Sequence, residues 1–253
     1  MASDLIDRYQ RARLLLSEEM YGPGFQSSGG ERFLEMTTPF MELQPGDRLL
    51  DLGCGTGGTL RYLARRHQIG GTGVDGAGDC VAMAREMAAR DALEGLEFVQ
   101  ADFRELELAG RYQAMWTCQA LLYVPDKVAC LRRVHPHLQA GRASVLADFC
   151  RGEQAVSAGF RAYCDDCGFE LPTVRGFAEM VAQAGFAVRE TVDYTDWFID
   201  AMVAEVARLE ANQADFLTRW QQADFDHLHG RWKQKMQFCR DGDMRVAYVV
   251  AQA

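Results

Sequence analysis

Short apolar runs alternate with amphipathic stretches from residue 48 to the end of the chain. The apolar runs have the length of buried strands, and the stretches between them repeat leucine, valine, alanine or methionine at helical spacing. The strands that this pattern predicts are residues 48–52, 71–74, 96–99, 112–117, 143–149, 187–191 and 244–251. Alternating strands and helices predict an α/β fold with a Rossmann-like, doubly wound, mainly parallel seven-stranded sheet, covered by helices on both faces.

Two stretches fall outside this alternation. The chain from Ser3 to Met20 has the pattern of an amphipathic helix and leads into a turn-rich segment at residues 21–30, which together predict an N-terminal helical lid. Residues 196–240 carry tryptophan and phenylalanine at helical spacing between the sixth and seventh strands. We expect this helical insertion to cover the carboxyl end of the sheet. The absence of an internal repeat or a long linker predicts one domain.

Composition narrows the class of partner. The chain has 253 residues, with 27 Lys and Arg against 36 Asp and Glu, so its net charge is −9. An acidic chain without a run of cations argues against nucleic acid as a partner, because that affinity comes mainly from clustered positive charge. The apolar runs are too short to span a membrane, and the start MASDLIDRYQ has no apolar signal region. We therefore expect a cytoplasmic protein that acts on a small molecule.

Eight cysteines without an export signal are typical of reduced thiols. Cys164 and Cys167 form the one close pair, but a zinc ribbon needs a second such pair and a redox motif needs an early βαβ context. We interpret these two cysteines as part of a pocket wall and expect no metal.

A glycine-rich turn follows the first strand, with the sequence GCGTGG at residues 53–58. Gly53 and Gly55 allow the backbone to turn sharply and approach a ligand, and the N–H groups of the next helix point toward it. Asp75 ends the second strand 20 residues after Gly55, where a carboxylate can accept both hydroxyls of a ribose. Asp102 and Phe103 follow the third strand and are placed to contact an adenine.

Asp51, immediately before the glycines, helps to choose between ligands. The turn lacks the spacing of a nicotinamide-dinucleotide site, and a carboxylate there would repel a pyrophosphate. The same carboxylate suits a cofactor with an ammonium group, such as S-adenosylmethionine. The runs LDLGCGTG (50–57), GVD (73–75) and QADF (100–103) resemble the motifs of class I S-adenosylmethionine-dependent methyltransferases.

A narrower resemblance runs over nearly the whole chain, to the phosphoethanolamine N-methyltransferases. It rests on the core motifs and on three further segments, which are residues 21–30, ADFC (147–150) with Ala162-Tyr163, and GRWKQKM (230–236). The resemblance implies that Ser27 and the N-terminal helix close over the cofactor. It also implies that Tyr9 orients or deprotonates an amine.

The positions at which this sequence differs from that family are those that would bind the methyl acceptor. Tyr123 stands where the family has a catalytic histidine, and Gln119 stands where it has an aspartate that holds the amine. Around the family's phosphate, two tyrosines are replaced by Phe149 and Phe169, and an arginine by Cys167. Loss of these groups argues against phosphoethanolamine and predicts a more apolar pocket, whose aromatic faces suit a small amine, an amino acid or a thioether.

The expected site residues fall into three groups. The expected catalytic pair is Tyr9 and Tyr123. The expected cofactor-binding residues are Ser27, Asp51, Gly53, Gly55, Asp75, Asp102, Phe103 and Gln119. The expected acceptor residues are Gln119, Phe149, Tyr163, Cys167, Phe169 and Lys235. The corresponding parts of the chain are the lid (1–30), a cofactor-binding core (31–195), a helical cap (196–243) and the last strand (244–253).

The leading hypothesis is methylation of a small molecule, most readily on the nitrogen of a small amine, with S-adenosylhomocysteine as product. One alternative uses the same cofactor for another reaction, either S-methylation of a thiol or thioether or cyclisation of the cofactor's aminobutyryl arm. A second is a non-catalytic module that binds the cofactor. A nucleic-acid methyltransferase is disfavoured by the acidic balance.

Overall fold

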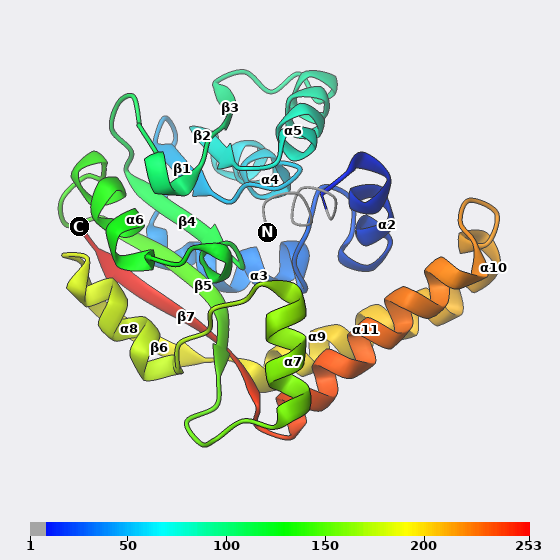
Figure 1. The fold of residues 1–253 in the computed structure, drawn as a ribbon. Helices are drawn as coiled ribbons and strands as arrows, with labels where there is room; N and C mark the ends of the chain where they lie inside the picture. The colour runs from blue at the N-terminus through cyan, green and yellow to red at the C-terminus, as the bar shows by residue number, and fades with distance from the viewer. Residues whose placement is uncertain (1–8) are drawn as a thin grey trace.

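A computed structural model describes residues 9–253, which form a seven-stranded sheet in the order β3-β2-β1-β4-β5-β7-β6 (Figure 1). The strands are β1 (Arg48–Leu52), β2 (Gly70–Asp75), β3 (Leu96–Gln100), β4 (Ala114–Cys118), β5 (Ala143–Arg151), β6 (Ala187–Asp193) and β7 (Met244–Gln252). β7 runs antiparallel to both β5 and β6, and the pairs among the first five strands are parallel. The predicted doubly wound, mainly parallel sheet is confirmed.

The helices complete the layers. They are α2 (Arg11–Tyr21), α3 (Gly30–Thr37), α4 (Gly58–His67), α5 (Gly78–Arg90), α6 (Lys127–Val134), α7 (Ala158–Cys167), α8 (Val174–Gln183), α9 (Thr195–Ala211), α10 (Gln213–Phe216) and α11 (Gln222–Arg240). Short 3₁₀ helices are η1 (Thr38–Met41), η2 (Phe103–Glu105), η3 (Leu121–Tyr123) and η4 (His135–His137).

Buried strands separate two apolar layers. In β1 every residue after Arg48 is buried, and Leu49 packs into one layer while Leu50 packs into the other. The first layer includes residues of α3, α4 and α5, and the second includes residues of α6 and α8. Because the order of the strands reverses between β1 and β4, the carboxyl ends of these two strands form the edge where ligands of such sheets bind.

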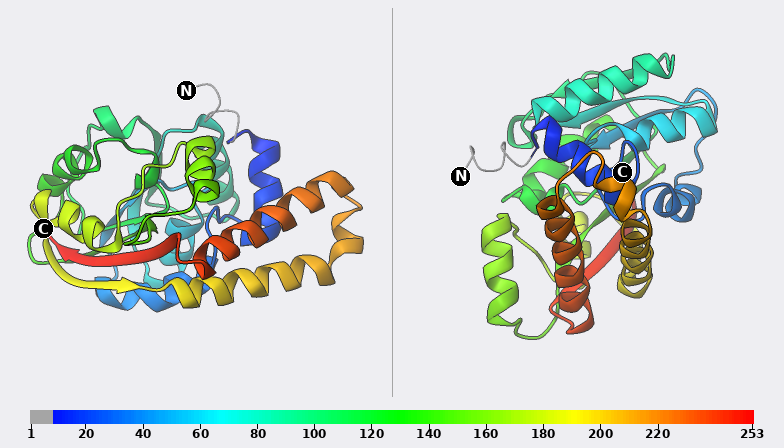
Figure 2. Two further views of the ribbon diagram at one scale, coloured as in Figure 1. Left: turned by 60° about the horizontal axis from the view of Figure 1, so that its bottom comes forward. Right: turned by 90° about the vertical axis from the view of Figure 1, so that its right-hand side faces the viewer.

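The insertion between β6 and β7 is a long antiparallel pair of helices, α9 and α11, joined through α10. It extends beyond the sheet, and α2 lies against it (Figures 1 and 2). Ion pairs hold α2 at both ends, from Arg11 to Glu86 of α5 at 2.6 Å and from Glu19 to Arg219 at 2.5 Å. No helix within residues 9–253 combines the length and the apolar character needed to cross a membrane.

The N-terminal helix differs from its prediction. Tyr9 and Gln10 form a turn and α2 begins at Arg11, so the expected helix from residue 3 to residue 20 is not continuous through these positions. Residues 3–8 lie outside the described part of the chain. Two helices, α3 and α7, were not predicted.

Candidate functional site

The glycine turn brings backbone close to the edge between β1 and β4. Gly53 has a φ of +85°, and a Cβ there would lie 2.2 Å from the Cβ of Ala120. The N–H groups of Gly53 and Cys54 both donate to the carbonyl of Val74, at 2.8 and 3.0 Å. Gly57, in a left-handed conformation, precedes the first residue of α4. The turn is therefore held tightly against β2, and the lack of a side chain at Gly53 leaves room for Ala120.

Two carboxylates flank the turn. Asp51 is 1% exposed, and its Oδ2 atom has no hydrogen-bond partner among the described residues. Burial raises the pKa of Asp51 to about 8, and the charge of Asp75 adds to that shift. Asp75 accepts the N–H groups of Gly55 and Ala77, each at 2.9 Å. A buried carboxylate without a partner favours a cationic ligand, which would stabilise its ionised form.

Asp102 and Phe103 differ in their placement. Phe103 approaches the glycine turn, with its Cζ atom 3.8 Å from where a Cβ of Gly53 would lie. The carboxylate of Asp102 instead binds the guanidinium of Arg104, which lowers the pKa of Asp102. The structure thus brings the ring, but not the Asp102 carboxylate, to the group around Gly53. A role for Asp102 in binding adenine stays a prediction.

The loop between α2 and α3, residues 22–29, lies directly on the glycine turn and is called the lid loop below. The carbonyl of Gly24 accepts the N–H of Gly58 at 2.9 Å, and the Cγ atom of Gln26 is 3.3 Å from where a Cβ of Gly55 would lie. Ser27 reaches the end of β4, where its hydroxyl accepts a weak bond from Cys118 at 3.8 Å. The lid loop is therefore closed over the turn.

α2 also touches the turn. The hydroxyl of Thr56, which is fully buried, donates to the carboxylate of Glu18 at 2.9 Å. This contact places the expected lid helix against the expected cofactor site.

Tyr9 and Tyr123 lie together although 114 positions separate them in the sequence. The Tyr9 hydroxyl donates to the Tyr123 hydroxyl at 3.0 Å, and the two rings meet edge to face. Burial, with smaller contributions from Tyr123 and Asp75, raises the pKa of Tyr9 well above its ordinary value. The Tyr9 hydroxyl therefore stays protonated near neutral pH and acts through hydrogen bonds.

Gln119 directly follows β4 and has a strained backbone conformation. Its φ is +53°, its N–H donates to the carbonyl of Ala147 at 2.9 Å, and its side-chain Nε2 is buried with no partner among the described residues. A positive φ in a residue other than glycine is uncommon and is held by surrounding structure. Gln119 thus offers an unpaired donor at the edge where β1 and β4 end.

Aromatic rings form a continuous wall from Tyr123 onward. Phe169 lies 5.4 Å from Tyr123 and 6.0 Å from both Phe149 and Tyr163, measured between ring centroids. These rings come from η3, β5, α7 and the segment after α7. The expected acceptor residues Phe149, Tyr163 and Phe169 are therefore brought together, and they adjoin the tyrosine pair.

Two cations from α11 reach this wall. Lys235 is 6% exposed and lies 4.2 Å from the ring of Trp232 and 6.0 Å from that of Phe149. Burial lowers the pKa of Lys235 to about 8. Arg231 lies 4.8 Å over the ring of Tyr163.

Arg231 is a site residue that the sequence analysis missed. Its guanidinium donates to the sulfur of Cys167 at 3.2 Å. Cys167 is the position where the resemblance lost an arginine, so the neighbouring helix supplies a guanidinium at that place. The available signal was its spacing, four residues before Lys235 in a predicted helix, which puts both on one face.

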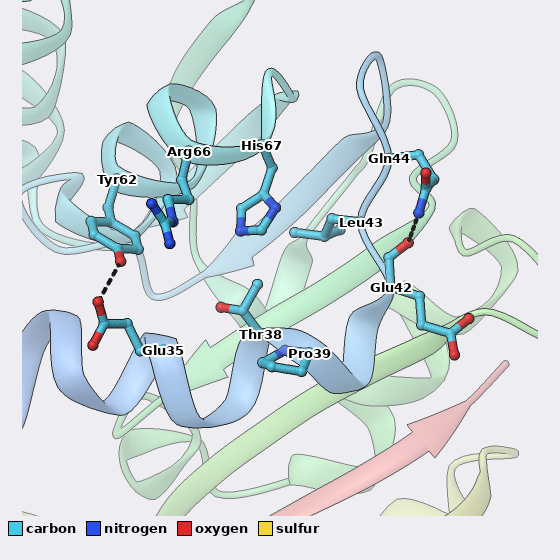
Figure 3. A pocket seen from close by; sticks show the side chains of 9 residues that line it. All are labelled: Glu35, Thr38, Pro39, Glu42, Leu43, Gln44, Tyr62, Arg66 and His67. Atoms are coloured by element: carbon cyan, nitrogen blue, oxygen red, sulfur yellow. Dashed lines mark hydrogen bonds between the residues drawn. The ribbon is translucent and has the colours of Figure 1, made fainter.

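A hollow of about 570 Å³ lies elsewhere, between α3, η1 and α4 (Figure 3). Its lining includes Glu35 and Tyr62, whose hydroxyl donates to Glu35 at 3.2 Å, and Gln44, which precedes β1. It contains none of the expected site residues. In the part of the chain that the structure describes, no three His, Cys, Asp or Glu side chains are arranged to bind a metal.

Comparison with known proteins identifies the domain. Residues 49–141 match a family model described as a methyltransferase domain. The chain is 29% identical over 248 residues to phosphoethanolamine N-methyltransferase 1 of Arabidopsis thaliana. This match covers 96% of the chain and 50% of the relative. Residues 49–141 therefore form a methyltransferase domain, and the chain resembles the class I S-adenosylmethionine-dependent methyltransferases. The predicted enzyme class and cofactor are confirmed, as is the resemblance to the phosphoethanolamine N-methyltransferases.

Solved structures share the fold. Phosphoethanolamine N-methyltransferase 2 of Haemonchus contortus, in complex with phosphomonomethylethanolamine and S-adenosylhomocysteine, superposes with a TM-score of 0.93 at 23% identity. That match covers 98% of this chain and 59% of the other. A cyclopropane synthase of Mycobacterium tuberculosis has a TM-score of 0.81 at 13% identity, over 99% of this chain and 98% of the other. The chain spans about half the length of the plant relatives it matches.

Proposed function

We propose that the chain transfers a methyl group from S-adenosylmethionine to the nitrogen of a small amine, with S-adenosylhomocysteine as the second product. The observation that carries the proposal is the contact between the Tyr9 and Tyr123 hydroxyls, at the junction of the lid, the cofactor edge and the aromatic wall. The relatives named as phosphoethanolamine N-methyltransferases also support transfer to nitrogen.

The residues at the edge of β1 and β2 fit this cofactor. Asp51 offers a buried, unpartnered carboxylate oxygen to a cationic group, and the glycine turn brings backbone to the same edge. The carboxylate of Asp75 accepts the backbone N–H groups of Gly55 and Ala77 on different oxygens and keeps acceptor capacity for a ribose hydroxyl. When bound, the cofactor supplies a methyl group that is already activated by the sulfonium charge.

The protein's main task is then to position the acceptor and exclude water. An acceptor nitrogen placed about 3 Å from the methyl carbon, and in line with the bond that breaks, gains most of its rate from orientation. The hydroxyls of Tyr9 and Tyr123 orient the nitrogen lone pair and relay its proton to water, each hydroxyl passing on one proton as it accepts another, so that neither has to ionise. Closure of the lid loop and α2 keeps water from the cofactor edge.

The cations of α11 refine the expected acceptor. Arg231 and Lys235 share one face of the helix and meet the aromatic wall, so they favour an amine that also carries an anionic group. The argument against phosphoethanolamine rested on the replacement of an arginine by Cys167 and of two tyrosines by Phe149 and Phe169. Because Arg231 brings a guanidinium to Cys167, that argument is weakened, and phosphoethanolamine joins the candidate acceptors.

A mass-shift screen tests the proposal. Purified protein with S-adenosylmethionine is incubated with amines, amino acids and thiols, and methylated products and S-adenosylhomocysteine are measured together. We expect both to appear only with an amine, and most strongly with an anionic amine such as phosphoethanolamine. Methylation of a thiol instead, or methylthioadenosine formed without any acceptor, would replace the proposal by one of the alternative reactions.

A further inference from the structure

A buried carboxylate outside the catalytic pair joins the lid to the cap. Glu205 lies on α9 and is 5% exposed. Its Oε1 atom accepts the N–H of Gly29 in the lid loop at 2.9 Å, and its Oε2 atom accepts the indole N–H of Trp232 on α11 at 2.7 Å. Burying a carboxylate is costly unless it is hydrogen-bonded, so such a group needs both of these donors.

Both partners of Glu205 lead to the proposed site. The ring of Trp232 lies 4.9 Å from that of Tyr21 at a tilted angle, and the Nζ atom of Lys235 lies 4.2 Å from the Trp232 ring. Gly29 ends the lid loop, with a φ of +93°, and a Cβ there would lie 2.6 Å from the indole of Trp197. The space around the backbone of Gly29 is therefore tightly restricted. Glu205 accepts the N–H of Gly29 in this restricted conformation.

Packing alone does not join the lid loop to α9. A hollow of about 330 Å³ lies between them, lined by residues of both segments that include Gly22, Gly29, Ala201 and Glu205. Because this space separates part of the loop from the helix, the bond from Gly29 to Glu205 is a specific link across the interface.

We propose that Glu205 is a positioning residue that holds the lid loop closed over the cofactor and couples this closure to the acceptor pocket through Trp232. The inference rests on the proposed function, because it takes the edge beneath the lid loop as the cofactor site. Glu205 does not contact the reacting atoms. It acts through the loop on one side and through the indole that supports Lys235 on the other.

The pKa of Lys235 provides a measurement that would not change if Glu205 had a purely structural role. Burial lowers the pKa of Lys235 most; the charged and titratable groups around it are Glu205 of α9, Cys167 of α7, Arg231 and Cys239 of its own helix, and the hydroxyl of Tyr21 in α2, 3.5 Å from its Nζ atom. Glu205 raises the pKa of Lys235, whereas Arg231 lowers it. Removing the charge of Glu205 must therefore lower the pH at which Lys235 becomes reactive as a neutral amine.

The test compares Glu205→Gln with Glu210→Gln. Glu210 is a matched control because it also links α9 to α11, through a contact with the Nε2 atom of His229 at 2.7 Å, but at the exposed surface. The dissociation rate of S-adenosylhomocysteine is measured by chase with excess unlabelled nucleoside. In parallel, acetylation of Lys235 is followed against pH by mass spectrometry.

We expect Glu205→Gln to release S-adenosylhomocysteine at least about tenfold faster and to shift the Lys235 midpoint to lower pH. Glu210→Gln should stay within about twofold of the wild type in both measurements. If Glu205→Gln does not fold, Trp232→Phe removes one donor and keeps an aromatic ring, and it should also speed release.

Release from the Glu205→Gln variant at the wild-type rate, or equal acceleration by Glu210→Gln, would overturn the inference about Glu205. A wild-type protein that binds no S-adenosylhomocysteine would instead overturn the proposed function, and the inference with it. The two failures are therefore distinguishable.

Discussion

Replacing Arg231 by leucine tests how the acceptor is recognised. Leucine keeps apolar bulk beside Tyr163 but removes the guanidinium that lies 4.8 Å over that ring and 3.2 Å from the sulfur of Cys167. A hydrogen bond to a charged group is worth about 1.5–3 kcal/mol, so binding of an anionic amine should weaken by about 10- to 150-fold. An amine without an anionic group should lose little affinity.

The assay compares two probes that differ only in the anion. Binding of phosphoethanolamine and of ethanolamine is measured by calorimetry on protein saturated with S-adenosylhomocysteine, for the wild type, Arg231→Leu and Lys233→Leu. Lys233 is the control because it is an exposed cation on the same helix. Equal weakening for both probes, or as large an effect from Lys233→Leu, would refute the role of Arg231.

Four further outcomes follow from the geometry. Tyr9→Phe should lower turnover by about 100-fold, the scale of lost proton-transfer assistance, with cofactor affinity unchanged; turnover equal to the wild type would remove Tyr9 from the chemistry. Asp75→Ala should weaken cofactor binding by about 1.5–3 kcal/mol in calorimetry, and unchanged affinity would exclude the ribose role. Because Lys235 has a pKa of about 8 and is charged below it, binding of phosphoethanolamine should fall as pH rises through 8, whereas a flat profile would exclude Lys235 as its partner. Gly53→Ala, which meets Ala120, should cost about 1–3 kcal/mol more in urea unfolding than Gly46→Ala, which meets open space at a similar φ; equal losses would show that the close approach does not matter.

The fold followed from the sequence where periodicity was strong. All seven strands were expected, most of them as short apolar runs bounded by turns or helices, and the polar β6 from its position after the helix that stops at Gly185. α3 and α7 were missed because their apolar positions are few and interrupted. The signals that define α7 are local, namely the bond from the Phe160 N–H to Ser157 at its start and Gly168, with a φ of +68°, at its end.

Only those residues of the candidate site could be predicted that local spacing or the family resemblance identifies one at a time. The glycine turn and Asp75 follow from chain-local spacing, and Tyr9 with Tyr123 came from the resemblance. Spacing from Lys235 could place Arg231 on the same face of α11, but its contact with Cys167 could not be predicted, because it depends on α11 packing beside α7. Tertiary packing decides which side chains from different helices come into contact. A prediction made for each helix separately does not include such contacts.

The tethers at the two ends of α2 have a kinetic consequence. Arg11 with Glu86 is an exposed pair, and Arg219 of the pair at Glu19 is half exposed, so salt screens these attractions over a Debye length of about 8 Å at physiological ionic strength. Any exchange of nucleoside that displaces α2 must first separate these charges. Rising ionic strength should thus shorten the time for which spent cofactor is retained, making product release tunable by the surrounding electrolyte.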